Sequence, residues 1–220
     1  MITINRIKEL KNILFSAVLA DILDELGIRN SALEDRIRPL SPNMKIMGRA
    51  FTILAADVYE QPQDPYKLEL AAVDNLKKGD VVVVKINGSI SSPCGFWGEL
   101  LSTAALSHGC LGAVIDGHTR DAQRIIEMNF PIFVRGFSPY DSKGRTDVVA
   151  YQIPIKSGNT LINPGDIIFA DLDGIVCIPK KLEDVVIEKA LNKLKYEDIV
   201  KQELLKGASA QEVFDKYHIL

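Results

Sequence analysis

Apolar residues recur every three or four positions early in the chain. They run from Val18 to Leu26, after a serine that can cap a helix (Ser16) and before a glycine that can end one (Gly27). This spacing predicts an amphipathic helix. Further along, the pattern predicts a strand over 49–56, a helix over 65–75, a buried strand over 81–86, a helix over 98–108 and a short strand over 112–116.

The second half of the chain is richer in strands. The pattern predicts a helix over 121–129, a strand over 131–134, strand-rich segments over 148–155 and 167–178, a helical region over 182–205 and a last helix capped by Ser209. Helices and strands thus alternate first, and consecutive strands and then helices follow. This order predicts a layered α/β domain with a mixed sheet. We expect a single domain over 1–220, with a C-terminal helical region over about 182–220.

Composition narrows the class of partner. The 220 residues are 47% hydrophobic, which is enough for a sizeable core, and the formal net charge is -3. A chain without excess positive charge has no electrostatic reason to bind nucleic acid or an anionic membrane. We therefore expect a small-molecule partner, no nucleic acid and no membrane.

Cysteine usage and the N-terminal stretch indicate the compartment. Cys94, Cys110 and Cys177 are isolated, without a CxxC pair, so neither a disulfide framework nor a zinc ribbon is predicted. Polar residues such as Glu9 and Lys11 interrupt the first apolar stretch, which therefore does not resemble a signal peptide. A cytoplasmic location is expected.

Adjacent opposite charges follow the strand over 112–116. Residues 117–119 form the expected loop, and Arg120 and Asp121 come directly after it, where open α/β sheets place ligand-binding groups. A carboxylate there can hold a divalent cation while a guanidinium binds an anionic oxygen. The alternative is that Asp121 only caps its helix and that Arg120 pairs with Asp116 at the surface.

A second stretch, residues 95–101, marks a turn from strand to helix. Gly95 and Gly98 allow close approach of the backbone, and the first N–H groups of the following helix are free to bind a carboxylate. The alternative is that Gly98 only starts the helix and that Trp97 only anchors the core. One loop could therefore bind a small acid while the other performs the chemistry.

Other ionisable residues have competing interpretations. Glu99 is the candidate acid or base, although a glutamate also suits a helix N-terminus. Glu127 could orient Arg120 or simply be a surface residue. Lys85 could form a Schiff base, but a strand-end lysine is more often a solvated terminus. His118 has no partner at ligand spacing, and oxygen ligands suit magnesium or manganese better.

The sequence resembles a known family at several motifs. Glu99 is separated from Arg120 and Asp121 by 20 residues (100 through 119), which resembles the acidic-X20-Arg-Asp signature of the 4-hydroxy-4-methyl-2-oxoglutarate/4-carboxy-4-hydroxy-2-oxoadipate aldolases. These share a fold with the RraA-like proteins. The segments SAVLADILD (16–24), GAVIDGHTRD (112–121) and NPGDIIFADLDGIVCIP (163–179) are also similar to family segments, so the resemblance covers most of the chain.

The resemblance implies a three-layer β/β/α swivelling-domain (RraA-like) fold that assembles as a homotrimer or homohexamer. In the family, the aspartate matching Asp121 binds Mg²⁺ or Mn²⁺, and the arginine matching Arg120 contacts the pyruvyl oxygens. Backbone amides of the loop matching Gly98, Glu99, Leu100 and Leu101 hold the pyruvate carboxylate. The implied activity is that of a divalent-metal-dependent class II pyruvate aldolase that cleaves 4-hydroxy-2-oxo acids and decarboxylates oxaloacetate.

Two other functions remain alternatives. The chain could be an RraA-like regulator of ribonuclease E activity that acts as a protein-binding scaffold, since fold alone does not decide function. Methyl transfer ranks last, because no glycine-rich strand-loop-helix suits that cofactor. The groups that recognise the far end of the 2-oxo acid stay open; Arg49, Arg135 and Arg145 are candidates, and a neighbouring subunit can contribute others.

Overall fold

The computed structural model describes residues 2–88 and 94–218. Its helices, in chain order, are α1 (Ile4–Ile13), α2 (Ser16–Glu25), α3 (Lys67–Asp74), α4 (Glu99–Ser107), α5 (Ala122–Glu127), α6 (Glu183–Leu205) and α7 (Ala210–Tyr217), with a 3-10 turn at Lys180–Leu182 before α6. All but α1 were predicted. A capping box between Ser209 and Glu212 starts α7, as the sequence indicated.

Strands form one large curled sheet and a small hairpin. In chain order they are β1 (Arg38–Pro39), β2 (Ile46–Asp57), β3 (Asp80–Asn87), β4 (Gly95–Trp97), β5 (Gly112–Thr119), β6 (Ile132–Phe137), β7 (Thr146–Tyr151), β8 (Ile155–Ser157), β9 (Thr160–Ile162), β10 (Ile167–Ala170) and β11 (Ile175–Ile178). The large sheet has the order β1-β6-β5-β3-β2-β10-β11, with β4 beside β5 and β7 beside β2, and β8 pairs only with β9.

The large sheet is mixed, as predicted. β2, β3, β5 and β6 run parallel to one another, whereas β10 pairs antiparallel with both β2 and β11. The parallel strands are nearly continuous apolar runs, because a parallel sheet is covered on both faces. Their carboxyl ends therefore meet at one edge of the sheet, close to the starts of α4 and α5.

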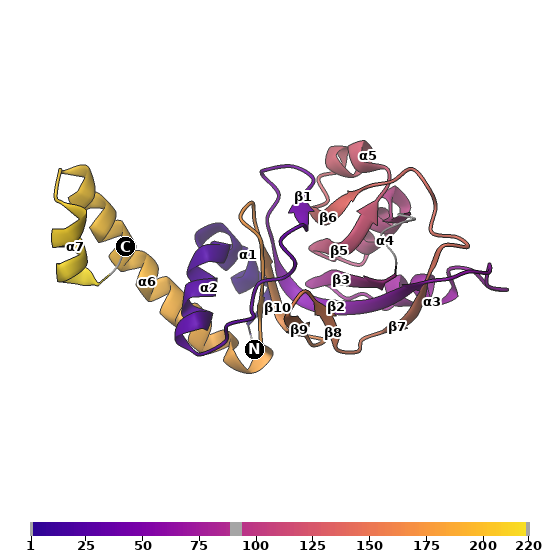
Figure 1. The fold of residues 1–220 in the computed structure, drawn as a ribbon, viewed down its shortest axis with the longest axis horizontal. Coiled ribbons are helices and arrows are strands. Elements are labelled where there is room, and N and C mark those ends of the chain that lie inside the picture. The colour runs from indigo at the N-terminus through magenta and orange to yellow at the C-terminus, as the bar shows by residue number, and fades with distance from the viewer. Residues whose placement is uncertain (1, 89–93, 219–220) are drawn as a thin grey trace.

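Figure 1 shows the layers of sheet and helices, and three apolar clusters lie between them. One lies between the sheet and the helices α3, α4 and α5 and contains the fully buried Trp97 and Phe130. A second, around Phe133, fills the space toward the β8–β9 hairpin on the other face. The third packs α1, α2 and the first half of α6 against β10 and β11, around Phe169. This arrangement agrees with the expected three-layer β/β/α fold.

The start of α2 differs from the sequence-based expectation. Ser16 is the first helical residue rather than the cap, and Phe15 occupies the cap position without a side-chain hydrogen bond. The Ser16 hydroxyl instead donates to Asp171 over 2.6 Å, and its backbone N–H donates to the same carboxylate over 2.8 Å. Asp171 thus ties α2 to the turn after β10.

Helix α6 leaves the body of the molecule and α7 folds back beside it (Figure 1). The two are tied by Lys216 and Tyr217, which both donate to the Glu203 carboxylate. Among the described residues, no helix has the length and apolar character needed to cross a membrane.

Candidate active site

The carboxyl end of β5 carries the central residues of the site. β5 extends through Thr119, so residues 117–119, which were expected to form a loop, belong to the strand. The Thr119 hydroxyl and the Arg120 backbone N–H both donate to the carbonyl oxygen of Trp97, over 2.7 and 2.9 Å. The Trp97 side chain is 0% exposed, and its indole donates to Ser102 of α4. The end of β5 and the first turns of α4 are thus both hydrogen-bonded to the same buried residue, Trp97.

Arg120 lies between two carboxylates. Its Nη1 is 3.0 Å from Oδ1 of Asp141, and its Nε is 3.7 Å from Oδ2 of Asp121. Asp141 also accepts a hydrogen bond from the Tyr66 hydroxyl. Although burial opposes ionisation, the Tyr66 hydrogen bond and the charge of Arg120 lower the pKa of Asp141. The expected alternative, an Arg120–Asp116 pair, is therefore wrong.

Asp121 does not act as a side-chain cap for its own helix. It has a left-handed backbone conformation with φ of 55° at the start of α5 and makes no capping hydrogen bond there. Its Oδ2 instead accepts the backbone N–H of Glu99 over 3.2 Å. Gly98 faces the same oxygen, because a Cβ at Gly98 would lie 2.8 Å from it. The residues of the two predicted loops are therefore in direct contact.

The start of α4 can bind an anion. Leu100 and Leu101 lie in the first turn of α4, where backbone N–H groups have no acceptor within the helix. Among the residues that the structure describes, neither N–H has a hydrogen-bond acceptor. Leu100 is 78% exposed, so its amide is near solvent. The Glu99 side chain points toward α5, where its Oε2 is 3.8 Å from Nε of Arg124.

The donor set at Asp121 suits a hard, hydrated cation. Its side chain is 40% exposed, and only Oδ2 accepts the Glu99 N–H. Mg²⁺ commonly binds through one or two carboxylates and keeps several waters. Among the described residues, no cluster of three or more His, Cys, Asp or Glu side chains could enclose a metal ion. Asp121 is therefore suited to an open site completed by water and ligand, not to a closed protein cage.

Asp116 belongs to a separate, buried cluster on the other face of the sheet. It accepts hydrogen bonds from Lys85 and Ser157, each over 2.8 Å, and from Arg135, which also lies 3.7 Å from Glu34. Burial opposes ionisation of Asp116, but the hydrogen bonds from Arg135, Lys85 and Ser157 lower its pKa. Lys85 is thus an ion-pair partner rather than a solvated strand terminus.

The remaining candidates lie elsewhere. Arg49 forms a two-pronged ion pair with Glu183, near the start of β2 and far from the β5 end. Glu127 accepts from Gln123 and does not orient Arg120. Arg145 is next to the site, because its Nη1 donates to the backbone oxygen of Asp141 over 3.1 Å.

His118 lies beside the Asp116 cluster and not beside Asp121. Burial, followed by the charge of Arg135, lowers the pKa of His118. Among the described residues, no group of three or more His, Cys, Asp or Glu side chains places His118 in a metal cluster.

Three residues near Arg120 were not found by sequence reasoning: Tyr66, Glu69 and Asp141. Glu69 is 4% exposed, and among the described residues its Oε2 has no hydrogen-bond partner. Burial, followed by repulsion from Asp141 and Asp147, raises the pKa of Glu69 to about 8. Tyr66 immediately precedes α3, Glu69 lies in its first turn and Asp141 lies in the loop after β6, and no motif or regular spacing marks them.

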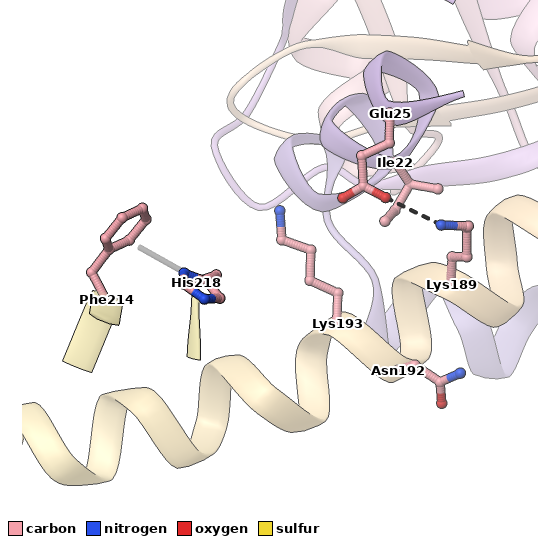
Figure 2. A pocket seen from close by; sticks show the side chains of 7 residues that line it. All are labelled: Ile22, Glu25, Lys189, Asn192, Lys193, Phe214 and His218. Carbon is pink, nitrogen blue, oxygen red and sulfur yellow. Dashed lines mark hydrogen bonds and ion pairs between the residues drawn. The ribbon is translucent and has the colours of Figure 1, made fainter. Parts of the chain in front are cut away.

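A pocket of about 400 Å³ lies away from this site, between α2, α6 and α7 (Figure 2). Its charged lining residues are paired: Lys189 binds Glu25, and Lys193 binds Asp21, a neighbour on α2. Phe214 packs edge-on against His218 at its outer end. None of the residues expected to perform chemistry lines this pocket.

Several known proteins are similar to this chain in sequence. Over 175 residues the chain is 34% identical to a protein of Halalkalibacterium halodurans named "Putative 4-hydroxy-4-methyl-2-oxoglutarate aldolase", covering 80% of this chain and 77% of that protein. Protein DlpA of Legionella pneumophila is 33% identical over 202 residues, covering 92% of this chain. The chain spans only 32% of the length of DlpA.

A solved structure and a family model are both similar to this chain and both belong to RraA-like proteins. The crystal structure of Streptomyces coelicolor RraAS2, described as an unusual member of the RNase ES inhibitor RraA protein family, superposes with a TM-score of 0.79 at 30% identity. It covers 91% of this chain and 97% of that one. The family model described as RraA-like (Aldolase/RraA) matches residues 16–177, which include both loops of the candidate site. The chain therefore belongs to the RraA-like family.

Proposed function

We propose that this protein is a divalent-metal-dependent lyase that cleaves 4-hydroxy-2-oxo acids to pyruvate and also decarboxylates oxaloacetate. The observation that carries the proposal is the meeting of Arg120, Asp121 and the start of α4, where Asp121 Oδ2 accepts the Glu99 N–H over 3.2 Å. A guanidinium, an open carboxylate and free helix amides are then within reach of one small acid. The names of several relatives support an aldolase.

Substrate binding would use the backbone. The carboxylate at C1 of the 2-oxo acid would accept N–H groups at the start of α4, within Gly98–Leu101, where the helix dipole also favours negative charge. Its 2-keto oxygen would then lie toward Arg120. Neither interaction needs a lysine, and the nearest candidate, Lys85, is bound to Asp116.

The reaction leaves charge on pyruvate. In the aldol cleavage, a base removes the proton of the 4-hydroxyl, the C3–C4 bond breaks, and its electron pair forms the enolate of pyruvate while C4 becomes a carbonyl. In the decarboxylation, the same bond breaks with release of CO₂. A proton then adds to C3 and gives the methyl group of pyruvate. Arg120 would stabilise the developing oxyanion at O2, as a fixed positive charge does in other enzymes.

Asp121 would hold the divalent cation, Mg²⁺ or Mn²⁺, with water in the other positions. When bound, such a cation supplies Lewis-acid stabilisation of negative charge on the keto acid. Glu99 is the candidate for moving the proton, directly or through water, because its carboxylate is half-exposed at the same helix start. The Nε of Arg124 lies 3.8 Å from the Glu99 carboxylate.

The test is a substrate panel followed by pyruvate release. Oxaloacetate and branched 4-hydroxy-2-oxo acids are incubated with wild type, Arg120→Ala and Glu99→Gln, with added Mg²⁺ or Mn²⁺ and with a chelator. We expect pyruvate from at least one acid, its loss with the chelator, and a drop of at least about 100-fold in Arg120→Ala, the range seen when one oxyanion donor is removed. Full turnover in Arg120→Ala would refute the mechanism.

A protein-binding regulator of ribonuclease E-type enzymes is the second candidate, and the name of the related Streptomyces coelicolor structure favours it. A scaffold has no need of Arg120 or of a metal. If purified chain inhibited such a ribonuclease equally well as Arg120→Ala and in the presence of chelator, and released no pyruvate, this second function would replace the first.

The assembly that we propose is a homotrimer or homohexamer in the cytoplasm. The projecting α6–α7 pair supports an assembly, because it carries exposed apolar side chains: Tyr196 is 54%, Leu205 72% and Phe214 42% exposed. Light scattering on a sizing column measures the mass directly, and a monomer would refute this part of the proposal.

A further inference from the structure

Two side chains that no motif marks bind the active-site arginine in series. The Tyr66 hydroxyl donates to Oδ2 of Asp141, and Oδ1 of the same carboxylate lies 3.0 Å from Nη1 of Arg120. Each carboxylate oxygen therefore has its own donor. A carboxylate held at both oxygens has a fixed orientation, and a fixed carboxylate fixes the guanidinium bound to it.

The backbone of Tyr66 is in an uncommon conformation. Its φ is 68°, in the left-handed region, at the position before α3. A bulky residue with positive φ is rare and costs conformational energy, and such residues cluster at functional sites. Tyr66 thus precedes the first residue of α3, and its side chain binds Asp141.

The charges in this series are fixed at neutral pH. Burial, followed by the hydrogen bond to Asp141, raises the pKa of Tyr66 to about 12, so its hydroxyl stays a donor. The pKa of Asp141 is lowered by Tyr66 and Arg120 against the effect of burial, so it stays an acceptor. Glu69 is also nearby, and its pKa of about 8 keeps it largely neutral at this pH.

Arg120 is closer to Asp141 than to the candidate metal ligand, Asp121. Arg120 Nε is 3.7 Å from Asp121 Oδ2, which is an ion-pair distance but too long for a hydrogen bond, whereas its Nη1 is 3.0 Å from Asp141. Without Asp141, the guanidinium would be free to turn onto Asp121 and occupy the carboxylate that a cation needs. Asp141 would thus hold Arg120, and Asp121 would stay available to a cation.

We propose that Tyr66 and Asp141 are positioning residues that hold the Arg120 guanidinium toward the start of α4 and away from Asp121. The inference rests on the proposed function, because it assigns Arg120 the task of meeting a developing oxyanion. Neither residue needs to touch the substrate.

The test uses Tyr66→Phe and Asp141→Asn, with Tyr59→Phe as the matched control, since Tyr59 is 99% exposed. Oxalate, a planar dianion with the shape of pyruvate enolate, is titrated into each Mn²⁺-loaded protein, and kcat and KM for pyruvate release are measured in parallel. We expect oxalate affinity and kcat to fall about tenfold in both variants, with KM changing less than about threefold, because the oriented charge matters most when the oxyanion forms. Tyr59→Phe should match wild type.

A double-mutant comparison separates positioning from a general structural effect. Tyr66→Phe is combined with Arg120→Ala, and oxalate affinity is measured again. If Tyr66 acts through Arg120, Tyr66→Phe lowers oxalate affinity by less than about twofold when Arg120→Ala is already present. A full additional tenfold loss in that background would overturn the inference. Asp141→Asn carries the same comparison if Tyr66→Phe fails to fold. A wild type that binds oxalate but releases no pyruvate would overturn the proposed function alone.

Discussion

The side chain of Asp121 accepts the backbone N–H of Glu99, 22 residues earlier in the chain, over 3.2 Å between Oδ2 and N. This hydrogen bond joins the residue after β5 to the first residue of α4. The carboxylate is therefore placed by the same helix start that would bind the acid. A substitution at either residue should therefore alter the position of the other. We make two predictions from this contact and two from the buried carboxylates Glu69 and Asp116.

Gly98→Ala should damage the site and leave the fold stable. The new Cβ would lie 2.8 Å from Asp121 Oδ2 and 3.3 Å from Cγ of Arg120, so both side chains must shift. The Gly98 backbone, with φ of -152°, is open to any residue. We expect at least a tenfold loss of kcat/KM and a change in unfolding free energy below about 1 kcal/mol. Gly174→Ala, where nothing lies within 4 Å, is the control. Wild-type kinetics in Gly98→Ala would contradict the packing argument.

Asp121→Asn should weaken Mn²⁺ binding without disturbing α4. The asparagine oxygen can still accept the Glu99 N–H, but it lacks the charge that attracts a cation. We expect the dissociation constant for Mn²⁺, measured by calorimetry, to rise at least about tenfold, and the melting temperature to stay near that of wild type. Asp173→Asn, at an exposed turn, should bind Mn²⁺ as wild type does. Equal affinity in the Asp121 and Asp173 variants would exclude Asp121 as the metal ligand.

Glu69 should make stability fall as pH rises. Its folded-state pKa of about 8 lies above the ordinary value of 4.5, so the folded chain holds a proton that the unfolded chain releases between these values. No stability is lost below pH 4.5, and the loss is complete above about pH 8. Burial at 4% exposure makes the effect on the order of a few kcal/mol.

The check is urea unfolding of wild type and Glu69→Gln at pH 5, 6.5 and 8. Glutamine has nearly the same shape and does not titrate. The difference in unfolding free energy between the two proteins therefore reports the ionisation of Glu69. Wild type should lose stability relative to Glu69→Gln at each step. A difference that stays constant over this range would mean that Glu69 is already ionised at pH 5.

Asp116→Ala should destabilise the protein strongly. Asp116 is 4% exposed and neutralises Lys85 and Arg135, whose side chains are 22% and 21% exposed. Removing one partner of a buried ion pair commonly costs about 3–5 kcal/mol, and we expect the lower end because both cations reach some solvent. Denaturant unfolding measures the loss. Asp64→Ala, in an ion pair that is 71% exposed at Asp64, should stay within about 0.5 kcal/mol of wild type; equal losses would contradict the role of burial.

Strong periodicity explains why most of the fold was predictable. The apolar spacing of α2 and the unbroken apolar run of β3 identified both elements from the sequence. α1 was not predicted, because its buried residues, Ile7 and Leu10, form only a narrow stripe in a largely polar segment. β5 was predicted too short, since Gly117 and His118 are not strand formers and are held in the strand by pairing with β4 and β6.

The site was predictable only where it follows a strand end. Arg120 and Asp121 follow β5, and Gly98 opens α4, so their proximity follows from the topology of a parallel sheet. Asp141 and Tyr66 lie in irregular segments, and long-range contacts set their places. The Gly95 N–H, for example, donates to the Tyr140 carbonyl over 2.8 Å and brings the Asp141 loop to β4. No spacing along the chain encodes that bond.

The shared carbonyl of Trp97 has a consequence for how relatives can diverge. Because Thr119 and Arg120 are both bonded to this fully enclosed residue, their spacing from α4 is set in the interior, where replacements are rarely tolerated. The side chains of Phe137 and Tyr140, by contrast, are 63% and 60% exposed. Substitutions of these exposed side chains can therefore alter the outer rim without changing the distance between the end of β5 and the start of α4.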